Sequence, residues 1–301
     1  MVNQLYAGVE AGGTKFECAV GTPSRILRSV TIPTTNPEET IPQVLAFFRK
    51  QKIKLGDLAG LGIGSFGPLD LNPDSNTFGH IGKTPKSNWS NFNLMSAFAE
   101  LNCPISIDTD VNAAGLAEAS LGAGRNKKVV LYVTIGTGIG VGVIINNKPF
   151  QGISHPEIGH ILIQQDLQDD GFAGICPYHG NCLEGLASGP AIEKRWGVSL
   201  SQLPIDHPAQ SLQARYISIL CTNLLLSFSP DVILIGGGVM KTPSLLDNVH
   251  NKVITLLKGY FSSVQTLDDI KTLITTPGLG AQAGITGSLL LAERASSILQ
   301  D

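Results

Sequence analysis

Apolar and polar residues form two kinds of pattern along this chain. Short, continuous apolar runs are typical of buried strands, and they alternate with longer stretches in which apolar residues recur with the period of a helix. In the first half we expect strands at residues 5–10, 16–20, 61–63 and 105–108, and helices at 38–52 and 111–121. Because strands and helices alternate, the pattern predicts an α/β fold.

The second half repeats the opening pattern. Apolar runs at 129–135 and 139–145 enclose a glycine turn, as the two opening runs do, which indicates a weak internal repeat. Further on we expect helices at 189–196, 210–229 and 281–299, and strands at 232–235 and 273–275. We divide the chain into an N-terminal domain, 1–117, and a larger C-terminal domain, 118–301. The last helix is a candidate to return to the N-terminal domain.

The segment 69–93 shows neither the apolar runs of strands nor the apolar period of a helix. It is rich in Asn, Pro, Ser, Gly and Thr and is too long for a simple connector. Long loops in compact domains tend to carry function, so we expect an irregular excursion of this kind.

Composition narrows the class of protein. A chain of 301 residues with 43% hydrophobic content can bury a large core, and a net charge of −3 gives no electrostatic case for nucleic acid. No stretch approaches the length that spans a bilayer and no secretory signal is recognisable, so we expect no membrane partner. Five cysteines, two of them in the cluster described next, argue against a disulfide framework and predict a cytoplasmic location.

Cysteine and histidine concentrate between residues 155 and 184. Four of these side chains have the spacing of metal ligands: His160, Cys176, His179 and Cys182. They are the soft and borderline ligands of a closed tetrahedral Zn²⁺ site, although single Cys and His residues more often fill core or surface positions. Two neighbouring carboxylates, Glu157 and Glu184, are not needed for that count. These carboxylates are suited to accept hydrogen bonds from the hydroxyl groups of a small polar ligand.

Two glycine turns between predicted strands have the chemistry of phosphate loops. The first contains Gly12, Gly13, Thr14 and Lys15, and the second contains Gly136, Thr137 and Gly138. Each turn presents backbone N–H groups and a Thr hydroxyl to an anion, and the first adds an ammonium group. Neither has the Walker A spacing or the dinucleotide fingerprint, and each alone can be a plain hairpin turn. Together they predict a clamp for nucleotide phosphates, with Glu10 a candidate Mg²⁺ ligand.

A pair of carboxylates marks the predicted strand-to-helix junction near residue 110. A kinase that acts on an alcohol needs a carboxylate to accept the hydroxyl proton, and Asp110 suits that role. Asp108 is the alternative base, and Asp110 can instead simply cap the following helix. Farther along, Gly236, Gly237 and Gly238 offer adenine or ribose a surface without side chains, or make a tight strand-to-helix turn.

These motifs, in this order and over essentially the whole chain, resemble the ROK family of sugar kinases and sugar-responsive repressors. The resemblance implies a two-domain actin/hexokinase-like (ribonuclease H-like) fold with a zinc-bearing loop. It also implies Mg·ATP between the two phosphate loops and a structural zinc that fixes the sugar contacts, with Asp110 as the base. The implied substrate-binding residues are Gly64, Ser65, Thr109, Asp110, Glu157, His160 and Glu184. The nucleotide-binding residues are those of the two loops, Gly189 and the three glycines at 236–238.

Three positions depart from the broad family pattern and resemble its bacterial fructokinase branch. Glu10 stands where the family usually has Asp, Thr109 where it has a sugar-binding Asn, and His179 intervenes in a cluster that usually has a third Cys. The polar segment 67–89 also resembles this branch. The resemblance implies an ATP-dependent fructokinase (ATP:D-fructose 6-phosphotransferase) that releases ADP, with mannose a second substrate. By family analogy we expect a homodimer.

Two other hypotheses stay open. A mannokinase, a glucokinase or a broad hexokinase uses the same scaffold, and Thr109 argues against glucose. A non-catalytic sugar sensor needs neither a base nor nucleotide loops. The repressors of the family also carry an N-terminal helix-turn-helix, which we do not expect in a sequence whose first strand starts near residue 5.

Overall fold

The computed structural model describes residues 4–84, 86–169 and 171–297, which form two compact units. Unit 1 comprises the chain up to Arg125, the segment Asn147–Pro156 and the chain from Ala281 onward. Unit 2 comprises Asn126–Asn146 and Glu157–Gly280. Helix α2 (Asp110–Leu121) runs without interruption through residue 117, where the sequence analysis placed the domain boundary. The last helix belongs to unit 1.

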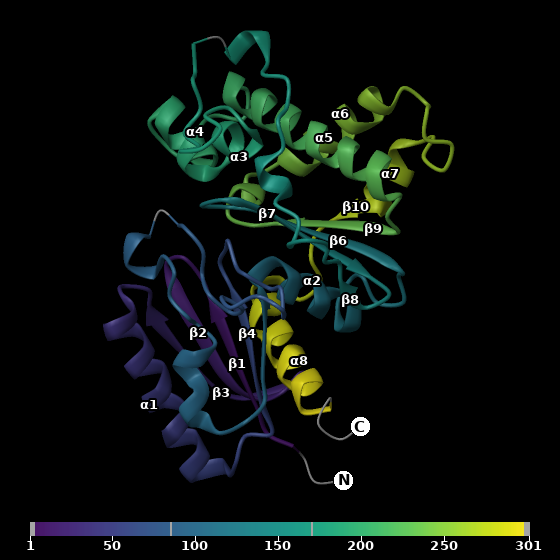
Figure 1. Ribbon diagram of the computed structural model, residues 1–301. Coiled ribbons are helices and arrows are strands. Elements are labelled where there is room, and N and C mark those ends of the chain that lie inside the picture. Colours follow the sequence, from purple (N-terminus) through teal and green to yellow (C-terminus); the bar gives the residue numbers. More distant parts are fainter. Residues whose placement is uncertain (1–3, 85, 170, 298–301) are drawn as a thin grey trace. The chain divides into compact units, whose positions relative to one another are not determined.

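Unit 1 is a twisted mixed sheet with helices on both faces (Figure 1). The strands of this sheet are β1 (Tyr6–Ala11), β2 (Lys15–Thr22), β3 (Arg25–Pro33), β4 (Gly60–Ser65) and β5 (Ile105–Thr109). The segment Asn147–Pro156 also contains the short β8 (Lys148–Pro149), which is not part of this sheet. The strand order is β3-β2-β1-β4-β5, antiparallel among the first three and parallel from β1 to β5. Helix α1 (Pro37–Leu55) lies on one face, and α2 and α8 (Ala283–Ser297) lie on the other.

Glycine at alternate positions of β4 brings two helices close to this sheet. A methyl group added to Gly60 or Gly62 would collide with the backbone of α8. At Gly64 it would come within 2.8 Å of Ala113 Cβ in α2 and 3.6 Å of Asp110 Cα. Because β4 has no side chains on this face, the first turn of α2 lies directly beside the end of the strand.

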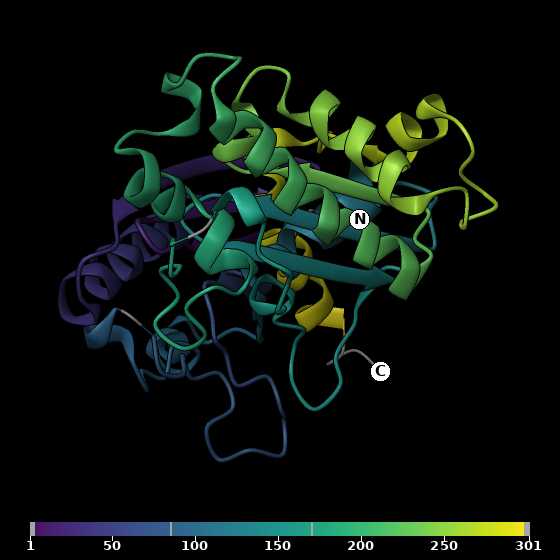
Figure 2. The ribbon, with the colours of Figure 1, turned by 90° about the horizontal axis from the view of Figure 1, so that it is seen from above.

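Unit 2 has a second mixed sheet covered by helices. Its strands are β6 (Val129–Ile135), β7 (Ile139–Ile145), β9 (Val232–Gly236) and β10 (Ile274–Thr275). Its helices are α3 (Leu183–Ala187), α4 (Gly189–Trp196), α5 (Pro208–Phe228), α6 (Leu245–Leu257) and α7 (Leu267–Leu273). Figure 2 shows the green helices α5 and α6 lying across the strands, and apolar residues from both layers form one core.

The two sheets share one topology, which supports the internal repeat seen in the sequence. The order β2-β1-β4-β5 corresponds to β7-β6-β9-β10, in each case an antiparallel hairpin followed by two parallel strands. Both hairpins enclose a predicted phosphate loop.

The sequence analysis did not predict β3, α3, α6 or α7. Strand β3 lies at the edge of its sheet with mostly exposed side chains, so it lacks the apolar run of a buried strand. Helix α6 does carry a helical apolar period, and its Leu245, Val249, Val253 and Leu257 are buried. The expected end of the last helix, beyond residue 297, lies outside the described residues. Among the described residues, no helix combines the length and the apolarity needed to cross a bilayer.

Candidate functional site

The carboxyl ends of three parallel strands meet at one edge of the sheet in unit 1. In the register of β1, β4 and β5, Glu10 lies beside Gly64 and Gly64 beside Asp108. One residue farther along, Ser65 lies beside Thr109. The edge therefore brings together the first phosphate loop, the predicted sugar-side residues of β4 and the start of α2. Ligands of open α/β sheets bind at such strand ends.

Asp110 is the first residue of α2, and another residue caps this helix. The cap is Thr109, whose Oγ1 accepts the N–H of Asn112 at 3.2 Å. Asp110 accepts the N–H of Val111 at 2.8 Å. Because the Thr109 hydroxyl satisfies the helix terminus, the interpretation of Asp110 as a simple cap loses its main support.

Asp108, the alternative base, is held by two hydrogen bonds. Its Oδ1 accepts the Thr109 N–H at 2.7 Å and the side-chain amide of Asn112 at 2.7 Å. Burial raises the pKa of this carboxyl group. The sequence analysis missed Asn112, which is 2% exposed and four residues after Asp108 in an alanine-rich helix. A single amide at that spacing is the signal that could have identified it.

Glu10 is a largely buried carboxylate beside the first phosphate loop. Burial, and then the negative charges of Glu17 and Asp110, raise its pKa to about 7. Its Oε2 is buried and has no hydrogen-bond partner among the described residues. A partly dehydrated, unpartnered carboxylate oxygen next to a phosphate loop fits a site for a hard divalent cation such as Mg²⁺.

Replacing Glu10 with Gln should stabilise the magnesium-free protein above neutral pH. A carboxyl group whose pKa rises from 4.5 in the unfolded chain to about 7 in the folded protein binds more protons when folded, so stability falls as pH rises between these values. The difference corresponds to about 3 kcal/mol. Urea unfolding in magnesium-free buffer should show the variant more stable at pH 8, with little gain at pH 5. An equal gain at both pH values would contradict the assignment.

The first phosphate loop, between β1 and β2, is held by its neighbours. The Gly12 N–H donates to Lys15 O at 2.9 Å. The Thr34 hydroxyl donates to Gly12 O at 2.8 Å, and the Thr34 N–H donates to Thr14 O at 2.9 Å. The N–H groups of Gly13 and Thr14 donate to no other group in the described chain. The loop is therefore a fixed turn with two N–H groups available to an anion.

The second phosphate loop lies in unit 2, between β6 and β7. The Gly136 N–H donates to Gly138 O at 2.9 Å, and the Gly189 N–H at the start of α4 donates to Gly136 O at 2.7 Å. Strand β9 pairs with β6, and Gly237 beyond it has a φ of 96° and lies against Ile135. The structure thus gathers the predicted nucleotide residues of unit 2: Gly136, Thr137, Gly138, Gly189, Gly236, Gly237 and Gly238.

The predicted metal ligands form one cluster. One ligand atom from each of His160, Cys176, His179 and Cys182 lies within 4.8 Å of the others. The Nδ1 of His160 is 3.5 Å from Cys182 Sγ and 3.7 Å from Cys176 Sγ, and the Nδ1 of His179 is 3.7 Å from Cys176 Sγ. A tetrahedron with Zn–S of about 2.3 Å and Zn–N of about 2.0 Å has an S–N edge of about 3.5 Å. The S–N separations of 3.5–3.7 Å fit such a centre.

The predicted sugar-side residues of unit 2 adjoin this cluster. The Nε2 of His160 is 3.8 Å from Glu184 Oε1, so the ring can point one nitrogen at a metal and the other at a carboxylate. Glu184 Oε2 accepts the N–H of Ile139 at 2.8 Å, at the end of the second phosphate loop. Glu157 is exposed and its carbonyl accepts the His160 N–H at 3.0 Å. Glu184 therefore joins the metal cluster to the phosphate loop.

A buried polar network fixes the chain that carries the cluster. Asp169, 4% exposed, accepts hydrogen bonds from Tyr216 Oη at 2.5 Å and from Arg195 at 2.7 Å. The Gln165 side-chain amide donates to Asp169 O at 3.0 Å, and its oxygen accepts from Asn181, next to Cys182, at 3.2 Å. Helices α4 and α5 thereby position the loop that joins His160 to the other three predicted metal ligands.

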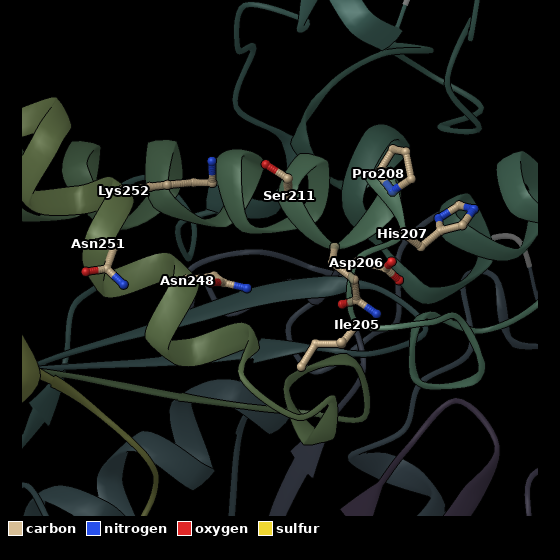
Figure 3. A pocket seen from close by; sticks show the side chains of 9 residues that line it. Ile205, Asp206, His207, Pro208, Ser211, Asn248, Asn251 and Lys252 are labelled. Atoms are coloured by element: carbon tan, nitrogen blue, oxygen red, sulfur yellow. The ribbon is translucent and has the colours of Figure 1, made fainter.

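A separate hollow of about 360 Å³ lies on unit 2, at the start of α5 and beside α6 (Figure 3). Its lining includes Asp206, Ser211, Asn248, Asn251 and Lys252. It contains none of the predicted site residues.

Comparisons with known proteins agree with this geometry. The model of the ROK family matches residues 6–295. A fructokinase of Zymomonas mobilis is 42% identical over 96% of this chain and 96% of its own length. A fructokinase of Streptococcus mutans is 40% identical over 97% of this chain and 99% of its own length. A ROK family glucokinase from Streptomyces griseus, solved in complex with glucose and AMPPNP, superposes with a TM-score of 0.76 at 25% identity, covering 96% of this chain and 99% of that one.

These comparisons confirm the predicted fold class and the resemblance. The α/β architecture with two mixed sheets is that of the actin/hexokinase-like ROK kinases, and the match extends over almost the whole sequence. This chain belongs to the ROK family.

Proposed function

We propose that this protein is an ATP-dependent fructokinase that converts D-fructose to D-fructose 6-phosphate. The observation that carries the proposal is the 40–42% identity to fructokinases over 96–97% of the chain. The described site supports it, because the carboxylates and both phosphate loops that such a reaction needs are present. The matched region covers nearly the whole chain and so includes the segments that hold these residues.

Asp110 is the general base of this reaction. It accepts the proton of the fructose 6-hydroxyl as that oxygen forms a bond to the γ-phosphorus of ATP, and the bond from phosphorus to the β-γ bridging oxygen breaks to release ADP. Thr109 caps the helix, so the backbone that carries the Asp110 carboxylate is held in place at the end of β5. Asp108 stays bonded to Asn112 and supports the turn.

The remaining residues bind the two substrates. We assign the binding of the sugar hydroxyl groups to Gly64, Ser65, Thr109, Glu157, His160 and Glu184. We assign the binding of the ATP phosphates to the two glycine loops, and the binding of the adenosine part to Gly189 and the glycines at 236–238. Mg²⁺ with Glu10 as a ligand would neutralise phosphate charge when bound. The unpartnered Oε2 of Glu10 supports this assignment.

We assign Zn²⁺ to the cluster of His160, Cys176, His179 and Cys182. Its role is structural, because four protein ligands close a tetrahedral site and leave no position for substrate. The S–N separations of 3.5–3.7 Å support this assignment. The metal fixes the orientation of His160 and the start of α3, which carries Glu184.

A coupled assay of ADP release tests the function, with fructose, mannose and glucose in parallel on metal-replete protein with Mg·ATP. We expect turnover with a clear preference for fructose. Preference for mannose or glucose would assign the enzyme to another branch of the family. No turnover with any hexose would favour a non-catalytic sugar sensor. The homodimer stays a prediction, which sedimentation equilibrium can test.

A further inference from the structure

A second lysine lies beside the first phosphate loop, brought there by the irregular segment 69–93. A methyl group added to Gly13 would come within 3.2 Å of Lys86 Cε. Both residues belong to unit 1. The ammonium group of Lys86 forms no ion pair with any residue that the structure describes.

Lys15, the lysine that the sequence analysis assigned to phosphate, has a partner of its own. Its Nζ donates to Glu17 Oε2 at 3.0 Å, and its side chain is 60% exposed. A phosphate that recruits Lys15 must break this ion pair, whereas Lys86 has none to break among the described residues. Glu17 and Asp110, together with Glu10 when it is ionised, also make this edge of unit 1 negative. A polyanion that binds here needs a nearby positive charge.

The position of Lys86 is built into the fold. The carbonyl of Lys86 accepts the N–H of Trp89 at 2.8 Å, and Trp89 is fully buried against Phe16, with ring centroids 5.3 Å apart. The indole N–H of Trp89 donates to Thr35 O at 2.9 Å. The preceding residue, Thr34, holds the first phosphate loop through its two hydrogen bonds. Thr34 and Thr35, directly after β3, thus hold both the first phosphate loop and the turn that carries Lys86.

We propose that Lys86 is a further catalytic residue, whose ammonium group binds the γ-phosphoryl group of ATP at the turn of Gly13 and Thr14. This inference rests on the proposed kinase function. The turn supplies two backbone N–H donors, and Lys86 supplies the positive charge that a backbone turn lacks. The charge stabilises the transferring group, over which negative charge is spread in the transition state.

The test compares Lys86→Met, Lys86→Arg and the control Lys83→Met. Methionine keeps most of the aliphatic stem, arginine keeps the charge, and Lys83 is an exposed lysine three residues away in the same segment. We expect Lys86→Met to lower kcat/KM for Mg·ATP roughly 10²-fold. Lys86→Arg should recover at least a tenth of the wild-type value, and Lys83→Met should stay within about twofold of wild type, because its charge is solvated.

Binding measurements separate this inference from the proposed function. Calorimetry with Mg·ATP and with tripolyphosphate needs no sugar, so it reports on Lys86 even if fructose is not the substrate. Lys86→Met should lower the affinity for Mg·ATP and for tripolyphosphate at least about tenfold, since a charge-assisted hydrogen bond to phosphate is lost. The affinity for adenosine should stay unchanged. Unchanged affinity for both anions, or a larger loss with Lys15→Met than with Lys86→Met, would overturn the proposal. Equal urea midpoints for all variants exclude unfolding as the cause.

Discussion

Replacing Asp110 with Asn is expected to lower fructose phosphorylation by at least about 10³-fold while sugar affinity changes by less than about threefold. The amide has nearly the shape of the carboxylate and its oxygen can still accept the N–H of Val111, so the first turn of α2 keeps its geometry. What disappears is the acceptor for the hydroxyl proton. The measurement pairs steady-state kinetics with calorimetric titration of fructose.

The matched comparison is Asp108→Asn. Its amide oxygen can retain both hydrogen bonds that Asp108 accepts, from the Thr109 N–H and from Asn112. We therefore expect this variant to keep most of its activity. Near wild-type turnover in Asp110→Asn together with a large loss in Asp108→Asn would transfer the role of base to Asp108.

Loss of the metal is the second large expected effect. We expect the protein to carry one zinc ion per chain and Cys182→Ala to lose it, with a fall of at least about 3 kcal/mol in the free energy of unfolding. Fructose affinity should fall about tenfold or more in the same variant, because His160 is one of the proposed metal ligands and its Nε2 lies 3.8 Å from Glu184 Oε1. Elemental analysis, urea unfolding and sugar titration give the three readouts.

Cys221→Ala provides the control for this experiment. Cys221 is also a buried thiol of unit 2, but it lies in α5 and outside the cluster. Its replacement should leave metal content and fructose affinity unchanged, at a cost of about 1 kcal/mol for the lost buried atoms. Unchanged sugar affinity in a verified zinc-free Cys182→Ala protein would show that the metal does not support the sugar contacts.

The sequence predicted what local patterns determine. The bounds of β6, β7 and α4 agree with the structure to the residue, because apolar runs and glycine turns delimit them clearly. The four residues predicted to hold a metal were chosen from their spacing alone, and their side chains do converge. Local chemistry was sufficient in both cases.

Features that depend on tertiary packing could not be predicted in this way. The hydrogen bond from Asn112 to Asp108 and the contact between Lys86 and the first phosphate loop join residues whose neighbours give no local signal. Lys86 lies 73 positions after Gly13, in a segment without periodicity, so only the burial of Trp89 places it. Edge strand β3 was missed because exposed strands lack an apolar run.

The position of α8 in unit 1 has a consequence for synthesis of the chain on the ribosome. This last helix packs on β1 and β4, strands made from the first 65 residues, and it covers the glycine face of β4. More than two hundred residues are therefore made after this sheet's strand β4 before the helix that covers this face is available. Until then its bare glycine face stays open to aggregation or to chaperones, and translation that stops before α8 leaves that face uncovered permanently.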